Sequence, residues 1–205
     1  MRRPMGPLVL AVLLLMGNVL IVGPLRTAAQ EFPIMPDPAA CRVDPRPTDE
    51  VLSLWYDTAG NPIGPAATPS VGTAATLLTI PVGPSADAAT IEAITTAVTD
   101  LFACFAAGDF PRALALMTDK LAQTFSPGVG ASIDDARAFL EAPSEPGPAG
   151  EGPAILAVTD VMLLADGRVG AFVVIQENGV GDVAYLVFSP DDARWLWDED
   201  VHFAP

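Results

Sequence analysis

A carboxylate or an imidazole held in an apolar setting can transfer protons, and the sequence contains one candidate for such a carboxylate. Asp160 lies inside the apolar, β-branched run Ile155–Leu164. Strict alternation along a strand places Asp160 on the same face as Val158 and Met162, which we expect to point inward. Burial raises the pKa of a carboxylate, so Asp160 is a candidate general base. The competing interpretation, which we favour, is a strand-end aspartate that is hydrogen-bonded to the backbone or to Arg168.

The only histidine of the chain, His202, lies close to the C-terminus. Alternation along residues 194–203 puts His202 on one face with Asp200. A neighbouring carboxylate can tune an imidazole for acid–base catalysis. A terminal strand normally carries its charged side chains outward, however, and this face is then solvated and polar. We favour the solvated face and keep His202 only as a candidate binding residue.

Aromatic residues in the last third of the chain are the other binding candidates. Tyr185 and Trp197 could line an apolar pocket together with Trp195. The alternative is that they belong to the hydrophobic core, as aromatic side chains on strands usually do. One histidine and two well-separated cysteines make no zinc site. The acidic pairs match no calcium-loop spacing, and no phosphate loop or serine elbow occurs. We therefore predict no catalytic constellation beyond the candidate Asp160, no metal and no cofactor.

The most regular apolar pattern lies at residues 87–109 and predicts the central helix. Asp87 is the predicted N-cap, and Gly108 suits position C′, where φ is usually positive. An apolar stripe must lie against something, and the strand-like block 154–203 is the other large apolar surface. We therefore expect the helix to lie across that sheet. Its apolar face is predicted to consist of Ile91, Ile94, Val98, Leu101, Phe102 and Phe105.

Two further helices are predicted after the central one. Asp109 can cap the first of them, with a proline tolerated in its first turn. Ser132, with Asp135 three residues later, is the start signal of the second, Ile133–Glu141. The apolar contacts of the two helices are expected from Leu114, Leu116, Met117 and Leu121, and from Phe139 and Leu140.

The last third of the chain reads as strands joined by short turns, of which Asp166-Gly167 and Asn178-Gly179 are typical hairpin turns. Short turns imply antiparallel neighbours, and helices followed by strands are typical of an α+β domain. We predict an α+β fold in which a curved antiparallel sheet of four strands packs on three N-terminal helices. The expected strands are Ile155–Leu164, Arg168–Glu177, Val183–Phe188 and Arg194–Phe203.

The first 29 residues have the features of a secretion signal: arginines near the start, the apolar run Leu8–Val22 and small residues at Thr27-Ala28-Ala29. The charge-free stretch Pro4–Leu25 is also long enough to remain as an uncleaved membrane anchor. Both alternatives place the folded domain outside the cytoplasm, either secreted or tethered to the membrane through residues 4–25.

The rest of the chain divides into three segments. Residues 30–56 are rich in proline and read as an extended strap with a short helix that begins at a Thr48 cap. Trp55 and its neighbours are too apolar to leave unpacked, so we expect this short helix to dock on the domain. Residues 57–86 contain few large side chains and read as a flexible linker. The folded domain covers residues 87–205.

The formal net charge is -15, and loss of the first 29 residues, which hold three arginines and no acid, would bring it to -18. Such a surface repels nucleic acid and anionic lipid headgroups, so we expect no nucleic-acid partner. The acidic excess could favour cationic partners or metal ions. The simpler interpretation, which we favour, is that it keeps the protein soluble.

The two cysteines, Cys41 and Cys104, can form one disulfide in an exported chain. Cys104 falls on the flank of the central helix, where a segment outside the helix can reach it. Cys41 lies in such a segment, the strap. The bridge would close a loop of about 60 residues. Two free thiols are the alternative, and we expect the bridge.

Short segments of the chain resemble nuclear transport factor 2-like (SnoaL-like) domains. Leu101–Asp109, which ends in an Ala-Gly-Asp turn, and Ala113–Asp119 resemble the opening helices of that family. Leu164–Ala171 and Arg194–Glu199 resemble its hairpin and its last strand. The likeness covers about residues 87–203, and its motifs are turns and core positions, so they bear on the fold more than on activity.

The resemblance implies a cone-shaped α+β fold with a pocket between the sheet and the helices. Members of the family include isomerases, dehydratases, cyclases and hydrolases, and many have no catalysis. The strap around Cys41 lies outside the core pattern and looks like an extension found with exported versions.

We therefore expect an exported or surface-tethered domain that binds a small apolar ligand or a protein partner without catalysis. The alternative is a small-molecule isomerase, dehydratase or cyclase of the SnoaL-like type, with Asp160 as its pocket carboxylate. A third alternative is a homodimeric assembly module that pairs through its sheet. A deep pocket converging on one carboxylate would favour the enzyme, and a shallow one filled with methionine and aromatic side chains would favour binding or assembly.

Overall fold

The computed structural model describes most of the compact unit Phe32–Pro205. The predicted signal or anchor lies outside the described residues, and so does most of the predicted linker, residues 64–79. Those assignments, and the tether through residues 4–25, stay predictions. The described residues are 33–63, 80–127, 130–147, 152–177, 179–192 and 194–202.

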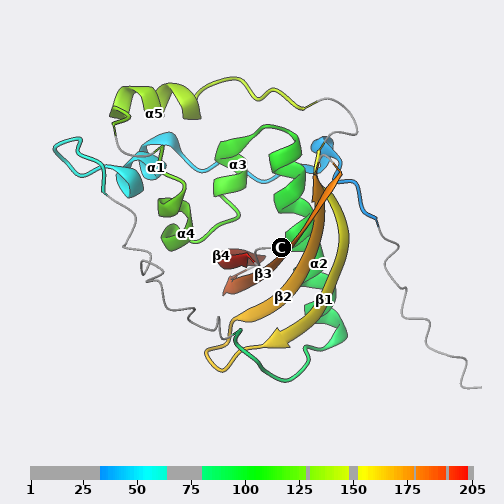
Figure 1. Ribbon diagram of the computed structural model, residues 1–205. Helices are drawn as coiled ribbons and strands as arrows, with labels where there is room; N and C mark the ends of the chain where they lie inside the picture. Colours follow the sequence, from blue (N-terminus) through cyan, green and yellow to red (C-terminus); the bar gives the residue numbers. More distant parts are fainter. Residues whose placement is uncertain are drawn as a thin grey trace, which may run out of the picture. The chain divides into compact units, whose positions relative to one another are not determined.

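The last third of the chain forms one antiparallel sheet, in which each strand pairs with the next one in sequence (Figure 1). The predicted short turns join the strands, and glycine takes the positive φ at two of them, Gly167 at 86° and Gly179 at 80°. The chain is thus an α+β protein with a four-stranded antiparallel sheet, as predicted. The strands are β1 Ala154–Leu163, β2 Val169–Glu177, β3 Val180–Asp191 and β4 Arg194–His202.

The third strand is longer than predicted, because Pro190 and Asp191 pair with the start of β4 instead of forming the turn. Proline has no N–H to donate, so it fits a strand only where no neighbour needs that donor. β2 begins at Val169, opposite Phe188, so Pro190 lies past the end of β2. The closed end of the β3–β4 hairpin therefore projects past the first residue of β2.

Helices fill the part of the chain before the sheet. The central helix, α2 (Ala88–Ala106), has the predicted ends: the Asp87 carboxylate accepts a first-turn N–H at 2.8 Å, and Gly108 has a φ of +63°. The predicted capping box of Ser132 and Asp135 also forms. The other elements are η1 Pro38–Ala40, α1 Thr48–Trp55, α3 Phe110–Leu114, α4 Asp119–Thr124 and α5 Ile133–Leu140.

The single helix predicted after Asp109 is divided into α3 and α4. Residues 116–118 lie between them and pair with β4. The Trp197 N–H donates to the Leu116 carbonyl, and the Thr118 N–H donates to the Trp197 carbonyl, both at 2.9 Å. Backbone groups that bond to a strand are not free to continue a helix. Asp109 caps α3 as predicted, and Thr118 caps α4.

The short helix α1 belongs to the hydrophobic core. Trp55 is fully buried, and its indole N–H donates to the Ala122 carbonyl at 2.8 Å. Tyr56 follows directly and is 4% exposed. Thr48 is the first helical residue and Pro47 precedes it, so the predicted capping role of Thr48 is wrong by one position. Docking of this segment through its aromatic residues is as predicted.

One hydrophobic cluster includes buried residues of every α-helix and of the sheet. α2 contributes Ile94, Val98 and Leu101, which the sequence pattern places on its buried face. Along β2 and β3, the members of the cluster recur at every second residue, as expected of one face of a sheet. They are Val169, Ala171, Val173, Ala184, Leu186 and Phe188.

The buried face of α2 is rotated relative to the predicted one. Ile91 is 39% exposed, and Phe102 and Phe105 are only partly buried. Cys104, which the pattern puts on the flank, is fully buried. The strap around Cys41 covers this side of the helix, and periodicity within α2 carries no information about a segment 63 residues away.

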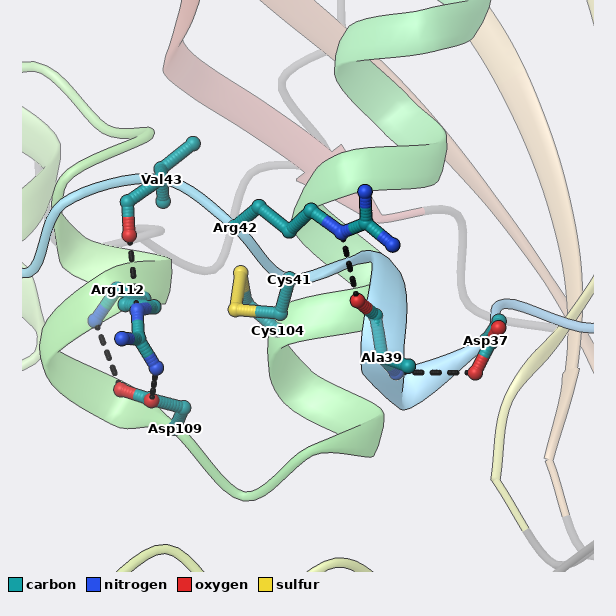
Figure 2. The surroundings of a disulfide bond; sticks show 8 residues. All are labelled: Asp37, Ala39, Cys41, Arg42, Val43, Cys104, Asp109 and Arg112. Atoms are coloured by element: carbon teal, nitrogen blue, oxygen red, sulfur yellow. Dashed lines mark hydrogen bonds and ion pairs between the residues drawn. A yellow bond between two sulfur atoms is a disulfide. The ribbon is translucent and has the colours of Figure 1, made fainter.

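The predicted disulfide joins Cys41 of the strap to Cys104 of α2 (Figure 2). A second contact lies next to it, where the Arg112 guanidinium donates to the Val43 carbonyl at 2.8 Å. Arg112 also binds the Asp109 carboxylate at 2.5 Å, so one side chain connects the strap to the start of α3. A disulfide fits an extracytoplasmic location.

The opposite face of the sheet carries a smaller cluster around Tyr185 and Val187. The segment before α2 contacts this part of the sheet. Ile80 packs against the cluster, and the Ala86 N–H donates to the Val161 carbonyl of β1 at 2.9 Å. The end of the predicted linker is therefore folded onto the sheet.

Candidate functional site

Asp160, the candidate general base, is exposed. The register of β1 against β2 shifts between Thr159 and Met162, and Asp160 has a φ of +48° within this bulge. A bulge adds a residue to one strand and so breaks the alternation of faces. Val161 is the buried residue there, at 5% exposure. The predicted inward orientation of Asp160 is wrong, because strict alternation assumes an unbroken ladder.

Tyr185 and Trp197, two candidate binding residues, lie in different clusters. Tyr185 is fully buried and its hydroxyl donates to the Pro81 carbonyl at 3.0 Å. Burial raises the pKa of Tyr185. Trp197 lies in the main core, where its ring centre is 5.9 Å from that of Phe125. The structure does not bring the two rings together, and each already has structural contacts.

His202 is the last described residue of β4, and its backbone pairs with Ala184 of β3. Its side chain lies outside the described part of the chain. Both interpretations of His202, the acid–base pair with Asp200 and the solvated face, therefore stay predictions.

A different set of residues meets in a groove of about 550 Å³ beside α2. This volume is within the roughly 300–1,000 Å³ typical of ligand pockets. We name it the α2–hairpin groove, because it is lined by one face of α2 and by the end of the β3–β4 hairpin, with single residues from the strap and from the segment before α4. The lining residues are Val43, Ala93, Thr96, Ala97, Asp100, Leu116, Pro190, Asp191, Asp192, Arg194 and Trp195.

Two features of the sequence leave this space open. Ala93, Thr96, Ala97 and Asp100 follow each other at helical spacing and so share one face of α2. Three of these four side chains are short and leave room next to the helix. The hairpin extends past β2 and carries Trp195 to the groove.

Asp100 is the chemically distinctive residue of the groove. It is partly buried, and burial raises the pKa of its carboxyl group. Within the described residues, its carboxylate has no hydrogen-bond or ion-pair partner. The sequence did not point to Asp100, because a helical wheel puts it beside the apolar stripe, where a charge is ordinary. The groove that it lines is formed together with the strap and the hairpin, which are distant in sequence.

The other charged groups of the groove leave it negative. The Arg194 guanidinium lies 3.8 Å from the Asp191 carboxylate, and both side chains are about half exposed. Asp192 is exposed beside them. The lining therefore holds three carboxylates against one guanidinium, and that guanidinium already has a carboxylate partner.

A second cavity of about 460 Å³ lies at the junction of α2, α3 and the segment after α5. Its walls include Phe105, Phe110 and Phe139, and the rings of the last two are 5.2 Å apart. Phe139, which the sequence predicts to pack inward, is 52% exposed. Two carboxylates line this cavity: Asp109 is occupied by its cap bond and its ion pair with Arg112, and Glu145 is exposed. Neither of them is a partly buried carboxylate without a partner, as Asp100 is.

Neither of these two cavities is lined by the core-facing residues of β2 and β3, where the family resemblance implies a pocket. Large core side chains occupy that region. Met117 and Phe188 are both buried in the main cluster, and Phe125 packs against it.

The described part of the chain has no metal cluster and one helix apolar enough to span a membrane. No three His, Cys, Asp or Glu side chains there are grouped so that they could hold a metal ion. One helix there, α2, is long and apolar enough to cross a membrane by length and composition, as the core helix of a soluble domain also can be. Ile94, Val98 and Leu101 of α2 are packed in the main cluster.

Comparison with known proteins leaves the family open. No family model matches the chain, no curated protein matches it, and no solved structure matches it. The nuclear transport factor 2-like assignment therefore rests on the residues that resemble that family, and the structure itself establishes an α+β fold with a four-stranded antiparallel sheet.

Proposed function

We propose that this chain is an extracytoplasmic, non-catalytic binding domain of the cone-shaped nuclear transport factor 2-like type, and that a small, largely apolar ligand binds in the α2–hairpin groove. The observation that carries the proposal is the groove itself: a space of about 550 Å³ in which an indole ring and short apolar side chains surround one partly buried carboxylate. Pockets that combine apolar walls with a few polar groups are typical of small-molecule sites.

Two further observations support this proposal. The Cys41–Cys104 disulfide fits an oxidising compartment, which agrees with the signal or anchor predicted for residues 1–29. The same disulfide holds the strap, and Val43 of the strap lines the groove. A fixed wall lowers the conformational entropy that a ligand must overcome on binding.

The proposal is tested with Nile red, a neutral apolar dye whose fluorescence rises in an apolar site. We expect the dye to bind the full chain purified after export, and an Ala97→Leu variant to bind it at least about tenfold more weakly, because the added side chain fills the groove. Ala138→Leu on the exposed side of α5 is the matched control and should bind like the parent chain. Absence of binding, or equal binding by Ala97→Leu, contradicts the proposal.

A second function is favoured by one observation, the raised pKa of the Asp100 carboxyl group in a cavity. Such a group is suited to act as a general base, as in the isomerases, dehydratases and cyclases of SnoaL-like type. In that case Asp100→Asn removes turnover of a compound from a small-molecule extract of the host but leaves Nile red binding intact. Mass spectrometry of the incubated extract, with Asp134→Asn as control, separates this function from simple binding.

A further inference from the structure

The charges around the α2–hairpin groove restrict the chemical class of its ligand, and this step rests on the proposed binding function. Asp100 is partly withdrawn from water and has no partner among the described residues. A carboxylate that has lost part of its hydration without gaining a partner is energetically unfavourable. A ligand that brings a positive charge to Asp100 removes this penalty, whereas a neutral ligand leaves it or increases it.

The aromatic residue of the groove also favours a cationic ligand. Trp195 lines the same cavity as Asp100 and is partly exposed. The face of an indole ring attracts a cation, more strongly than the ring of any other residue. The groove therefore offers a cation a carboxylate from α2 and an indole from β4.

An anionic ligand is disfavoured by the remaining charges. Arg194 is the one cationic side chain of the lining, and it lies 3.8 Å from Asp191. Asp192 adds a further negative charge at the exposed end of the hairpin. The sequence as a whole is strongly acidic, with a net charge of -15, so the long-range field also favours the approach of cations.

The rest of the lining fits an apolar chain or ring. Val43, Ala93, Ala97 and Leu116 present only hydrocarbon, and they come from the strap, from α2 and from the segment that pairs with β4. A ligand with a charge at one end and hydrocarbon at the other matches this distribution, because each end meets a surface of its own kind.

We infer that the α2–hairpin groove selects amphipathic cations: small organic amines that carry one positive charge on an apolar body, with the charge held between Asp100 and Trp195. Protonation at low pH removes the negative charge of Asp100. The preference for cations must therefore disappear at low pH. Asp191, Asp192 and Arg194 are the other titratable groups that line the groove.

Three probes of equal chain length test the inference: octylamine, octanol and octanoate, each used to displace Nile red from the full exported chain at neutral pH. We expect octylamine to bind about tenfold more tightly than octanol, and octanoate to bind more weakly than octanol. In Asp100→Asn the affinity for octylamine should fall to about that for octanol, while the affinity for octanol stays unchanged. Asp134→Asn, which removes the same charge from an exposed site on α5, should keep the preference.

The outcomes separate this inference from the proposed function. Equal binding of the three probes, or a preference for octylamine that survives Asp100→Asn, overturns the inference while the groove remains a binding site. Failure of the parent chain to bind Nile red or any probe overturns both. Trp195→Leu is a second variant that keeps an apolar wall, and it should reduce the preference for octylamine with little change for octanol.

Discussion

The Arg168 guanidinium lies 2.7 Å from a carboxylate oxygen of Asp198, and this ion pair connects the turn before β2 with β4 across the intervening strand β3. Asp198 is 9% exposed, and its other oxygen accepts the Thr118 hydroxyl at 2.9 Å. Asp198 is three residues from Trp195 on the same strand. The pair therefore holds the strand that supplies one wall of the α2–hairpin groove.

Loss of this ion pair should destabilise the fold. In Asp198→Asn the Arg168 guanidinium loses a largely buried partner, so we expect the free energy of unfolding to fall by about 1–3 kcal/mol in a denaturant titration. The comparison variant is Lys120→Ala, whose ammonium is 65% exposed and 3.5 Å from Glu199, and it should change stability by less than about 0.5 kcal/mol. Equal losses of stability from the two substitutions would show that the Asp198–Arg168 pair contributes no more to stability than an exposed ion pair does.

The disulfide should be a major source of stability. Cys41 and Cys104 are 63 residues apart, and a chain-entropy argument assigns about 4 kcal/mol to a crosslink that closes a loop of this size. We expect the Cys41→Ser, Cys104→Ser double variant to lose stability of that order, and addition of a reductant to have a similar effect on the parent chain. Thiol titration of unreduced protein supplies the direct check, since two reactive thiols would mean that the bridge is not formed.

Gly170 should tolerate no side chain. A Cβ atom there would lie 1.8 Å from the Tyr185 hydroxyl oxygen and 2.4 Å from the ring carbon that carries it. That ring is fully buried and its hydroxyl is bonded to Pro81, so it has little freedom to move. We expect Gly170→Ala to cost about 1–3 kcal/mol, measured by thermal or denaturant unfolding.

The matched control for this substitution is Gly147→Ala. No atom would lie within 4 Å of a Cβ at Gly147, so its stability should remain near that of the parent chain. If Gly170→Ala were as stable as this control, the Tyr185 ring would not lie against Gly170 of β2.

The partial burial of Asp100 should make stability depend on pH. Burial raises the pKa of Asp100, so over the range between its unfolded and folded pKa values the native state binds more protons than the unfolded chain. The free energy of unfolding therefore falls as the pH rises through that range. We expect Asp100→Asn to be more stable than the parent chain at neutral pH, and this gain to vanish below the ordinary aspartate pKa of about 3.9.

Urea unfolding at neutral and at acidic pH measures this effect, with Asp134→Asn as a variant that should show no gain. A destabilised Asp100→Asn at neutral pH would mean that the carboxylate has a favourable partner. The expected combination, in which the same substitution increases stability and removes the preference for cations, is typical of a residue retained for function at a cost in stability.

Features that depend on neighbouring residues could be predicted from the sequence. The Asp87, Asp109 and Ser132 caps and the turns at Gly167 and Gly179 all form where expected, because each is decided by hydrogen bonds or φ values within a few residues. The order of these elements was enough to predict the α+β class and the four antiparallel strands. The disulfide followed from the count and position of two cysteines.

Features that depend on pairing between distant segments could not be predicted. The helix expected after Asp109 breaks because residues 116–118 bond to Trp197. The candidate Asp160 turns outward because β1 takes in an extra residue against β2. Both errors came from rules that treat an element by itself, whereas strand pairing imposed a different backbone.

By itself, the sequence determined the α+β class, the four antiparallel strands and the caps of α2, α3 and α5, and it favoured a bridge between Cys41 and Cys104 over two free thiols. Only the tertiary structure decided which carboxylate lies in a groove, because the partly buried Asp100 lines one cavity together with Val43 of the strap and Trp195 of the hairpin, each tens of residues away. Periodicity reports the two sides of one element, but the loss of water from a side chain depends on what other segments cover it.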